Sequence, residues 1–429
     1  MKNKDKDISA FGSIIYFFKN FYQKLKELKL PQKFIERQKR IALYTDEGSS
    51  YESRLSFKFN LVKIIFVALL CVFSVFTLIF GGRALSYENV YYMFKDINYI
   101  SDYNESIPSS LSYSEPFNNQ DFAQFKNGLA VVSDREYKFF TLTGRTTLMN
   151  GSDYTDPRIC TSDSTALIYD AGKNDFSVYN SFICVYSEKL EYPINFADMA
   201  DDGSFVLVTR SKNYATSARI YNSDFEIISE YSKNDYIISS KMTSDGKYTV
   251  FMSLDSLDGD KKVTVSVLRN GRSELYSSFV NIGDMPYSFE ILSNDKIAVF
   301  YDSKFVIYNF KGSVKEEYVY PSTLTYVCAD KNGFTLAFKD NAINSSLLIS
   351  FDENGNQIRL VNLDASLYSL ARHGNYVYAL CEKEVLRIDT KWGGKASVPF
   401  ASDGGELLVL SGGDVLVCTE ISAYYLDFN

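Results

Sequence analysis

Histidine is almost absent from this chain, which has one, His373, among 429 residues. Zinc enzymes and related metal sites usually need two or more histidines, so sites of this kind are excluded. A Ser-His-Asp or Cys-His catalytic device would have to use His373. That residue stands in the sequence RHGNY at an expected turn, and we interpret it as an exposed turn residue without a catalytic role.

Glycine-rich nucleotide-binding motifs are missing as well. The sequence contains no P-loop and no dinucleotide-binding fingerprint, because its glycine pairs lie in turns between strands and do not open helices. This argues against a nucleotide-dependent enzyme. The sequence therefore assigns no catalytic, cofactor-binding or metal-binding residue and implies no cofactor.

Long apolar runs are also rare, and the exception is Ile64–Gly82, nineteen residues without a charge between Lys63 and Arg83. At about 1.5 Å of rise per residue, a helix of this length nearly spans the ~30 Å core of a bilayer. The run has no polar side, unlike a helix of a soluble domain. We predict a transmembrane helix over residues 61–83. A cleaved signal peptide is the alternative, but its apolar core would be shorter and would lie near the N-terminus.

Charge predicts the direction in which the chain crosses the membrane. Residues 1–63 carry 14 Lys and Arg against 7 Asp and Glu, whereas residues 84–429 carry 30 against 46. Positively charged flanks stay in the cytoplasm. We therefore expect a single-pass protein of the cell membrane, with a cytoplasmic N-terminus and an extracellular C-terminal domain. The acidic exterior argues against nucleic acid as a partner, because phosphate binding needs a basic surface.

The predicted cytoplasmic tail, residues 1–60, contains an amphipathic pattern. Large apolar residues recur at helical spacing between Phe11 and Leu28 with lysines beside them, and Pro31 is expected to end the helix. A basic amphipathic helix can contact the lipid surface or a partner protein. The alternative is a helix that only sets the topology of the chain.

A turn followed by an apolar strand recurs through the C-terminal region. Eight such segments begin near residue 118, and their turns lie about 41 residues apart. They read KNGLAVVS, TSDSTALIY, ADDGSFVLV, TSDGKYTVF, LSNDKIAVF, DKNGFTLAF, RHGNYVYAL and SGGDVLVCT, with turns near Gly128, Ser164, Gly203, Gly246, Asp295, Gly333, Gly374 and Gly413. A second strand with its own turn follows each segment, for example ARIYNSD and FVIYNFKG. Asn-Gly, Asp-Gly and similar pairs favour tight hairpins.

A period of about 40 residues with several strands per unit is typical of β-propeller blades. We therefore predict an all-β fold in which residues 118–429 form a propeller, most simply of eight four-stranded blades, with seven as the alternative. The chain ends just after the third strand of the eighth unit. The missing outer strand must then come from residues before the first unit, and we expect it within residues 106–117.

Residues 84–117 connect the predicted membrane helix to the propeller. Within them, residues 85–100 place Tyr87, Tyr91 and Phe94 on one helical face, and we expect a short helix there. A linker or the closing strand follows.

The arrangement resembles a family of single-pass membrane proteins of Gram-positive anaerobes, whose outer region is a propeller-like domain of unknown function. The resemblance rests on the turn and strand pattern, for example ADDGSFVLVTRSKNYATSARIYNSD followed by TSDGKYTVFMS. It covers the anchor and most of the outer region. It implies no catalytic residues.

Six cysteines are present, and five of them lie after the anchor. Cys381 and Cys418 occupy equivalent positions in successive units, where a small buried residue fits, so we expect free core thiols. Cys160 and Cys184 are the only pair close enough in sequence to suggest a disulfide, and the sequence leaves this open. Asp352 to Asn356, DENGN, lacks the spaced ligands of a calcium loop, and we interpret it as a turn.

The sequence favours a non-enzymatic binding or scaffold module for an envelope protein or polysaccharide. The alternative is a cell-wall polysaccharide hydrolase or lyase that uses carboxylates in the propeller's channel. The enzyme would need two or more acidic residues in one concave site, with at least one raised pKa. A third possibility is signalling, in which a ligand captured outside is sensed through the tail.

Overall fold

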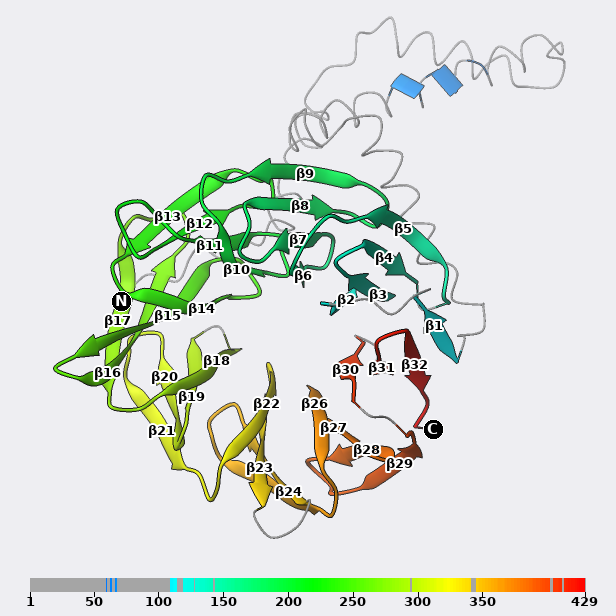
Figure 1. Cartoon of the computed structure of the whole chain (residues 1–429), viewed down its shortest axis with the longest axis vertical. Coiled ribbons are helices and arrows are strands. Elements are labelled where there is room, and N and C mark those ends of the chain that lie inside the picture. The colour runs from blue at the N-terminus through cyan, green and yellow to red at the C-terminus, as the bar shows by residue number, and fades with distance from the viewer. Residues whose placement is uncertain are drawn as a thin grey trace, which may run out of the picture. The chain divides into compact units, whose positions relative to one another are not determined.

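The structure is a computed structural model, and it describes residues 109–113, 119–126, 128–141, 143–293, 295–340, 345–401, 404–410 and 413–428, together with 59, 62, 63, 66 and 67. The described part of residues 96–429 is a ring of eight four-stranded antiparallel sheets (Figure 1). It is an eight-bladed β-propeller. The prediction of four-stranded blades is confirmed, and the seven-bladed alternative is wrong.

Seven of the eight blades consist of four strands joined in sequence, with the first strand innermost. Blade 1 comprises β2 (Asp121–Phe125), β3 (Gly128–Val132), β4 (Glu136–Phe140) and β5 (Thr146–Gly151), and blade 2 comprises β6 (Pro157–Thr161), β7 (Ala166–Asp170), β8 (Asp175–Tyr179) and β9 (Cys184–Lys189). Blade 3 comprises β10 (Ile194–Met199), β11 (Phe205–Thr209), β12 (Thr216–Tyr221) and β13 (Ile227–Lys233). Blade 4 comprises β14 (Tyr236–Met242), β15 (Tyr248–Leu257), β16 (Asp260–Arg269) and β17 (Leu275–Ile282).

Blades 5 to 8 repeat this order, except that the last blade takes its outer strand from the beginning of the domain. Blade 5 comprises β18 (Pro286–Ser293), β19 (Lys296–Tyr301), β20 (Lys304–Asn309) and β21 (Val314–Val319), and blade 6 comprises β22 (Leu324–Asp330), β23 (Gly333–Asp340), β24 (Ser345–Asp352) and β25 (Gln357–Leu363). Blade 7 comprises β26 (Leu367–His373), β27 (Tyr376–Cys381), β28 (Glu384–Asp389) and β29 (Lys395–Pro399). Blade 8 comprises β30 (Glu406–Val409), β31 (Val415–Cys418) and β32 (Ser422–Leu426) together with β1 (Ser110–Ser112).

The two ends of the domain close the ring by pairing in blade 8 (Figure 1). Strand β1 lies antiparallel to β32, with Leu111 opposite Ala423. The side chains of Leu111 and Tyr113 are buried in the apolar cluster shared by blades 8 and 1. The predicted closing strand within residues 106–117 is therefore confirmed.

The hydrophobic core lies between the blades. Eight clusters of buried apolar side chains occupy the eight blade-to-blade interfaces of the described ring. In the cluster between blades 5 and 6, Phe305 contacts Phe334 edge-on with ring centroids 4.9 Å apart. One sheet has two apolar faces and cannot cover both alone, so each blade depends on both neighbours.

Glycine and aspartate set the tight turns that the repeat predicted. Gly246, in TSDGKY, has φ 64° and closes the turn from β14 to β15 with its N–H donating to Thr243 O at 2.8 Å. In the β15–β16 hairpin, Asp258 and Gly259 have φ 53° and 90°, the left-handed pair that a two-residue hairpin needs. These turns fall where the sequence places them, because they depend on local residue types.

The segments predicted before the propeller lie almost entirely outside the described residues. These are the tail (1–60), the anchor (61–83) and the helix over 85–100. Of the tail and anchor, Phe59, Val62, Lys63, Phe66 and Val67 are described, and all five are helical and exposed. Within the described residues, no helix combines the length and apolar character needed to cross a membrane.

Candidate binding surfaces

The up-and-down order of the strands gives the propeller two different faces. Each first strand ends at a tight turn into the second strand, and each third strand ends at a turn into the fourth. We call the side that carries these turns the turn face. The opposite side carries the connections between second and third strands and those between blades, and we call it the loop face.

Blades 4 and 5 expose large apolar side chains at several positions on the loop face. Tyr236 begins β14, Leu257 is at the tip of the β15–β16 hairpin, and Val319 ends β21. Met285 and Tyr287 stand where blade 4 passes into blade 5. Tyr236, Tyr287 and Val319 are 67%, 52% and 70% exposed. We call these five residues the loop-face patch.

The patch is held in place by polar contacts beneath it. The Tyr287 hydroxyl donates to Thr325 O at 2.9 Å, and the N–H of Asp302 donates to Met285 O at 2.9 Å. The Lys304 ammonium lies 3.0 Å from Asp284 and 3.1 Å from Glu317. These contacts connect the beginning of blade 5 to the first strand of blade 6 and to later parts of blade 5, so Met285 and Tyr287 stand on a fixed base.

A polar cavity of about 610 Å³ lies at the inner strands of blades 3 to 6. Its lining contains four carboxylates, Asp198, Asp201, Glu290 and Asp330, together with Lys241 and Lys331. The Lys241 ammonium lies 2.6 Å from the Glu290 carboxylate and joins blade 4 to blade 5. The structure thus brings acidic side chains together in one concave site, as the enzyme alternative requires.

Asp198 is the acid in this cavity whose protonation is most perturbed. Burial raises its pKa to about 6, although Lys241 opposes the shift. Its Oδ2 accepts a hydrogen bond from the N–H of Met242 in the next blade, at 2.7 Å.

Asp330 accepts an equivalent bond from the next blade, from the N–H of Gly374 at 2.6 Å. It also lies 3.3 Å from the guanidinium of the buried Arg372, which donates to Phe334 O at 2.9 Å. In blade 1, Asp121 accepts from the N–H of Ile159 at 3.0 Å. The acids of the inner strands therefore connect consecutive blades. This gives Asp198 and Asp330 a structural role in addition to any chemistry.

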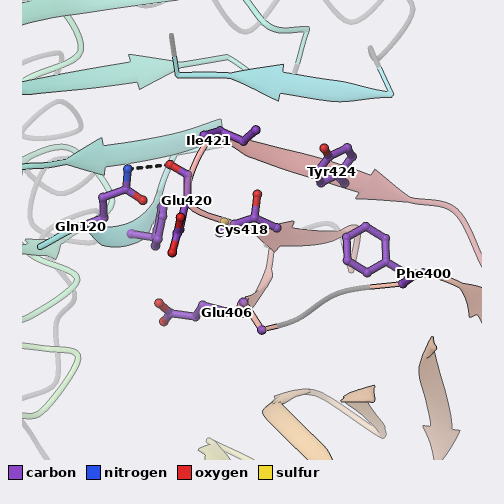
Figure 2. A pocket seen from close by; sticks show the side chains of 12 residues that line it. Gln120, Phe400, Glu406, Cys418, Glu420, Ile421 and Tyr424 are labelled. Carbon is purple, nitrogen blue, oxygen red and sulfur yellow. Dashed lines mark hydrogen bonds between the residues drawn. The ribbon is translucent and has the colours of Figure 1, made fainter. Parts of the chain in front are cut away.

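A second cavity, of about 820 Å³, lies where blade 8 meets blade 1 (Figure 2). Its lining is mixed, with Phe122, Phe400 and Tyr424 beside Glu406. Burial raises the pKa of Glu406, and the charge of Asp121 adds to the shift. Blade 8 has the shortest strands of the ring, with three to five residues each, which leaves space that longer strands would fill.

The sequence of residues 102–420 matches the model of DUF5711, a family of unknown function. This match spans well over half of the chain. The protein belongs to the DUF5711 family.

Three solved structures similar to this DUF5711 protein show its fold alone, since each is at most 14% identical to it. Sqt1 of Saccharomyces cerevisiae has a TM-score of 0.57 and 10% identity, covering 76% of this chain and 99% of Sqt1. BamB of Moraxella catarrhalis has a TM-score of 0.51 and 9% identity, covering 75% and 99%. The WD40 domain of SCAP from fission yeast has a TM-score of 0.51 and 14% identity, covering 76% and 97%. No curated protein matches the chain.

In the DUF5711 domain, His373 is the last residue of β26 and pairs with Tyr376 across the turn. It is only partly exposed, because the turn of blade 8 at Gly413 approaches its ring. The expectation of an exposed turn residue is therefore wrong in detail. The residue belongs to the strand before the turn.

The five cysteines of the DUF5711 domain are free thiols. Cys160 is on the inner strand β6 and donates to Ala197 O at 3.4 Å, whereas Cys184 is on the outer strand β9 and donates to Tyr186 O. The disulfide that their spacing suggested does not form, because the two residues lie on the innermost and outermost strands of blade 2. Cys381 and Cys418 are buried, which confirms the predicted core thiols.

The acidic segment DENGN is a turn, as expected. Asp352 Oδ1 accepts from the N–H groups of Asn354 and Asn356 at 2.8 and 2.9 Å, so this carboxylate stabilises the β24–β25 turn. Across the described residues, no three His, Cys, Asp or Glu side chains form a group that could hold a metal ion.

The sequence could not locate the patch or the polar cavity. Both are built from residues of different blades, and their proximity depends on ring geometry. The signal available was the strand register: once eight blades are assumed, the acids near the ends of the first strands are expected to lie close together on neighbouring inner strands.

Proposed function

We propose that this protein is a membrane-anchored extracytoplasmic propeller that binds an envelope protein and does not act as an enzyme. The observation that carries this proposal is the loop-face patch. Soluble domains rarely expose several large apolar side chains together unless the surface binds something. The two tyrosines of the patch offer apolar area together with a polar tip, a combination common at the centres of protein interfaces.

The partner we propose is a protein rather than a polysaccharide. The patch is formed by Tyr, Leu, Met and Val side chains, which lose contact with water when a partner covers them. Sugars would need more hydrogen-bonding groups than these side chains provide. The predicted anchor would hold the patch close to the outer surface of the membrane.

A purification from native membranes tests this. Full-length wild type, a Tyr236→Lys/Val319→Lys variant and a Trp392→Lys variant are purified under mild conditions, and the bound proteins and glycans are compared. Trp392 is 79% exposed and lies on the turn face, so it is a matched control. We expect one protein to co-purify with the wild type and with the Trp392→Lys control. The same protein should be absent from the preparation of the patch variant.

Equal recovery of that protein by all three would contradict the proposal. Retention of glycan in place of protein would favour the polysaccharide ligand.

The polar cavity favours one alternative, a hydrolase or lyase acting on cell-wall polysaccharide. Asp198, with its raised pKa, would be the acid and Glu290 the second carboxylate. Incubation of the purified protein with cell-wall polysaccharide tests this, with product release as the measurement. Turnover that Asp198→Asn and Glu290→Gln both abolish would establish the enzyme. No turnover by the wild type would exclude it for that substrate.

A further inference from the structure

The outer strand of blade 4 differs from those of the other blades. Outer strands carry an unpaired edge, and proteins usually protect such edges with charge, proline or short length. Five of the other outer strands carry charged residues, and one of these, β29, also ends in proline: CVYSEK, IISEYSK, VKEEYV, QIRLVNL and KASVP. The remaining two are uncharged but have three and six residues. Strand β17, LYSSFVNI, has eight residues and no charge.

The free edge of β17 presents regular backbone groups. Within the described residues, β17 pairs only with β16, and the N–H of Gly283 donates to Lys261 O at 2.8 Å. Bonded and non-bonded residues alternate along an antiparallel strand. The N–H and C=O groups of Ser278, Val280 and Ile282 therefore point away from β16, toward the open edge.

The same three residues are exposed, whereas the residues between them hold the strand to the domain. Val280 and Ile282 are 51% and 53% exposed. On the other side of the strand, the ring of Phe279 packs on Tyr308 with centroids 4.5 Å apart, and the Ser277 hydroxyl donates to Phe310 O in blade 5. The edge is thus both firmly positioned and open.

We propose that β17 pairs antiparallel with β17 of a second copy of this chain, about a two-fold axis at Val280. This register places Val280 opposite Val280 and Ser278 opposite Ile282, so all three outward-facing residues find bonded partners. The edge is suited to its own copy because its three outward-facing residues are placed symmetrically about Val280 and the strand presents no charge to repel itself. Asp284, just beyond the strand, already pairs with Lys304 at 3.0 Å.

This interface does not depend on the proposed partner. It uses the outer edge of blade 4, whereas the loop-face patch is built from strand ends and loops on one face. The homodimer would present two patches related by the two-fold axis.

A cysteine at the axis tests the pairing directly. Full-length Val280→Cys is made in a Cys71→Ser/Cys184→Ser background, which removes the thiol of the predicted anchor and the exposed thiol on β9, and is oxidised in native membranes. We expect most of the chain to run as a reducible dimer on a non-reducing gel, because the two introduced thiols face each other. Leu360→Cys, 49% exposed on the charged outer strand β25, should remain monomeric.

A charge at the same position tests the interface without cross-linking. Light scattering on the detergent-solubilised full chain should show a dimer for the wild type and for the control Leu360→Lys on β25. Val280→Lys should raise the dimer dissociation constant by about 100-fold or more, because each dimer would bring two ammonium groups together. Ser278→Pro, which removes an outward N–H while leaving the β16 pairing intact, should weaken the dimer too.

A monomeric wild type, or a dimer unaffected by Val280→Lys and Ser278→Pro, would overturn the proposal. Circular dichroism of each variant confirms that it is folded, so that loss of the dimer is not confused with loss of the domain.

Discussion

At the scale of single residues, buried charges on the inner strands influence both stability and any chemistry. Burial raises the pKa of Asp198 to about 6, so the folded protein holds a proton that the unfolded chain, with a pKa near 3.9, releases. The stability of the fold therefore decreases as pH rises from about 4 to about 6, and above pH 6 the ionised carboxylate costs about 2–3 kcal/mol.

Asp198→Asn should recover most of this cost at high pH. The amide oxygen can still accept from the N–H of Met242, and no charge is buried. We expect the variant to be more stable than wild type by about 1–3 kcal/mol at pH 8, with the difference nearly gone below pH 4. Urea unfolding at both pH values measures this. Asp224→Asn, at an exposed turn, should change stability by less than about 0.5 kcal/mol at either pH. Lower stability of Asp198→Asn at pH 8 would contradict this account.

Arg372 is the buried cation with the most partners at the inner strands. Its guanidinium lies beside Asp330 and donates to Phe334 O and Phe351 O. Arg372→Met should cost about 3–5 kcal/mol, because it leaves the mostly buried carboxylate of Asp330 without its counter-charge and two carbonyls without their donor. Arg158→Met, at a half-exposed pair with Asp156, should cost less than about 1 kcal/mol. Thermal unfolding compares the two, and equal effects would show that Arg372 is not structurally important.

At the scale of the elements, the closing strand β1 is short, yet it seals the ring. Leu111 is buried between two exposed serines, so one strand contains both a test residue and its control. Leu111→Asp should destabilise the domain by about 3 kcal/mol or more, because it places an unpaired charge in the cluster between blades 8 and 1.

Ser110→Asp should have little effect, since its side chain faces solvent. Limited proteolysis measures this. The junction between blades 8 and 1 should be cleaved much faster in Leu111→Asp than in wild type or Ser110→Asp. Similar cleavage of all three would mean that β1 does not close the ring.

The elements also show which features a sequence can predict. Turns such as TSDGKY and the Asp258-Gly259 hairpin depend on neighbouring residues, so the repeat revealed the blades and their number. The closing strand followed from counting strands. By contrast, Lys241 and Glu290 lie 49 residues apart and meet only because blades stack side by side. The polar cavity, the patch and the separation of Cys160 from Cys184 required the ring geometry.

At the scale of the whole molecule, eight interdependent blades form a base on which one sector stands out. Blades 4 and 5 carry the loop-face patch, the long β15–β16 hairpin and the uncharged edge of β17. The rest of the ring provides the packing that keeps this sector fixed. We expect binding to be concentrated there, with the predicted anchor placing it at the membrane.

Site-specific photocrosslinking in living cells tests the central claim most directly. A photoreactive amino acid replaces Tyr236 in the full-length protein, and separately Trp392 on the turn face, and adducts are compared after irradiation. The account predicts a discrete protein adduct from position 236 and none of the same kind from position 392. No protein adduct at 236, or the same adducts from both positions, would contradict it.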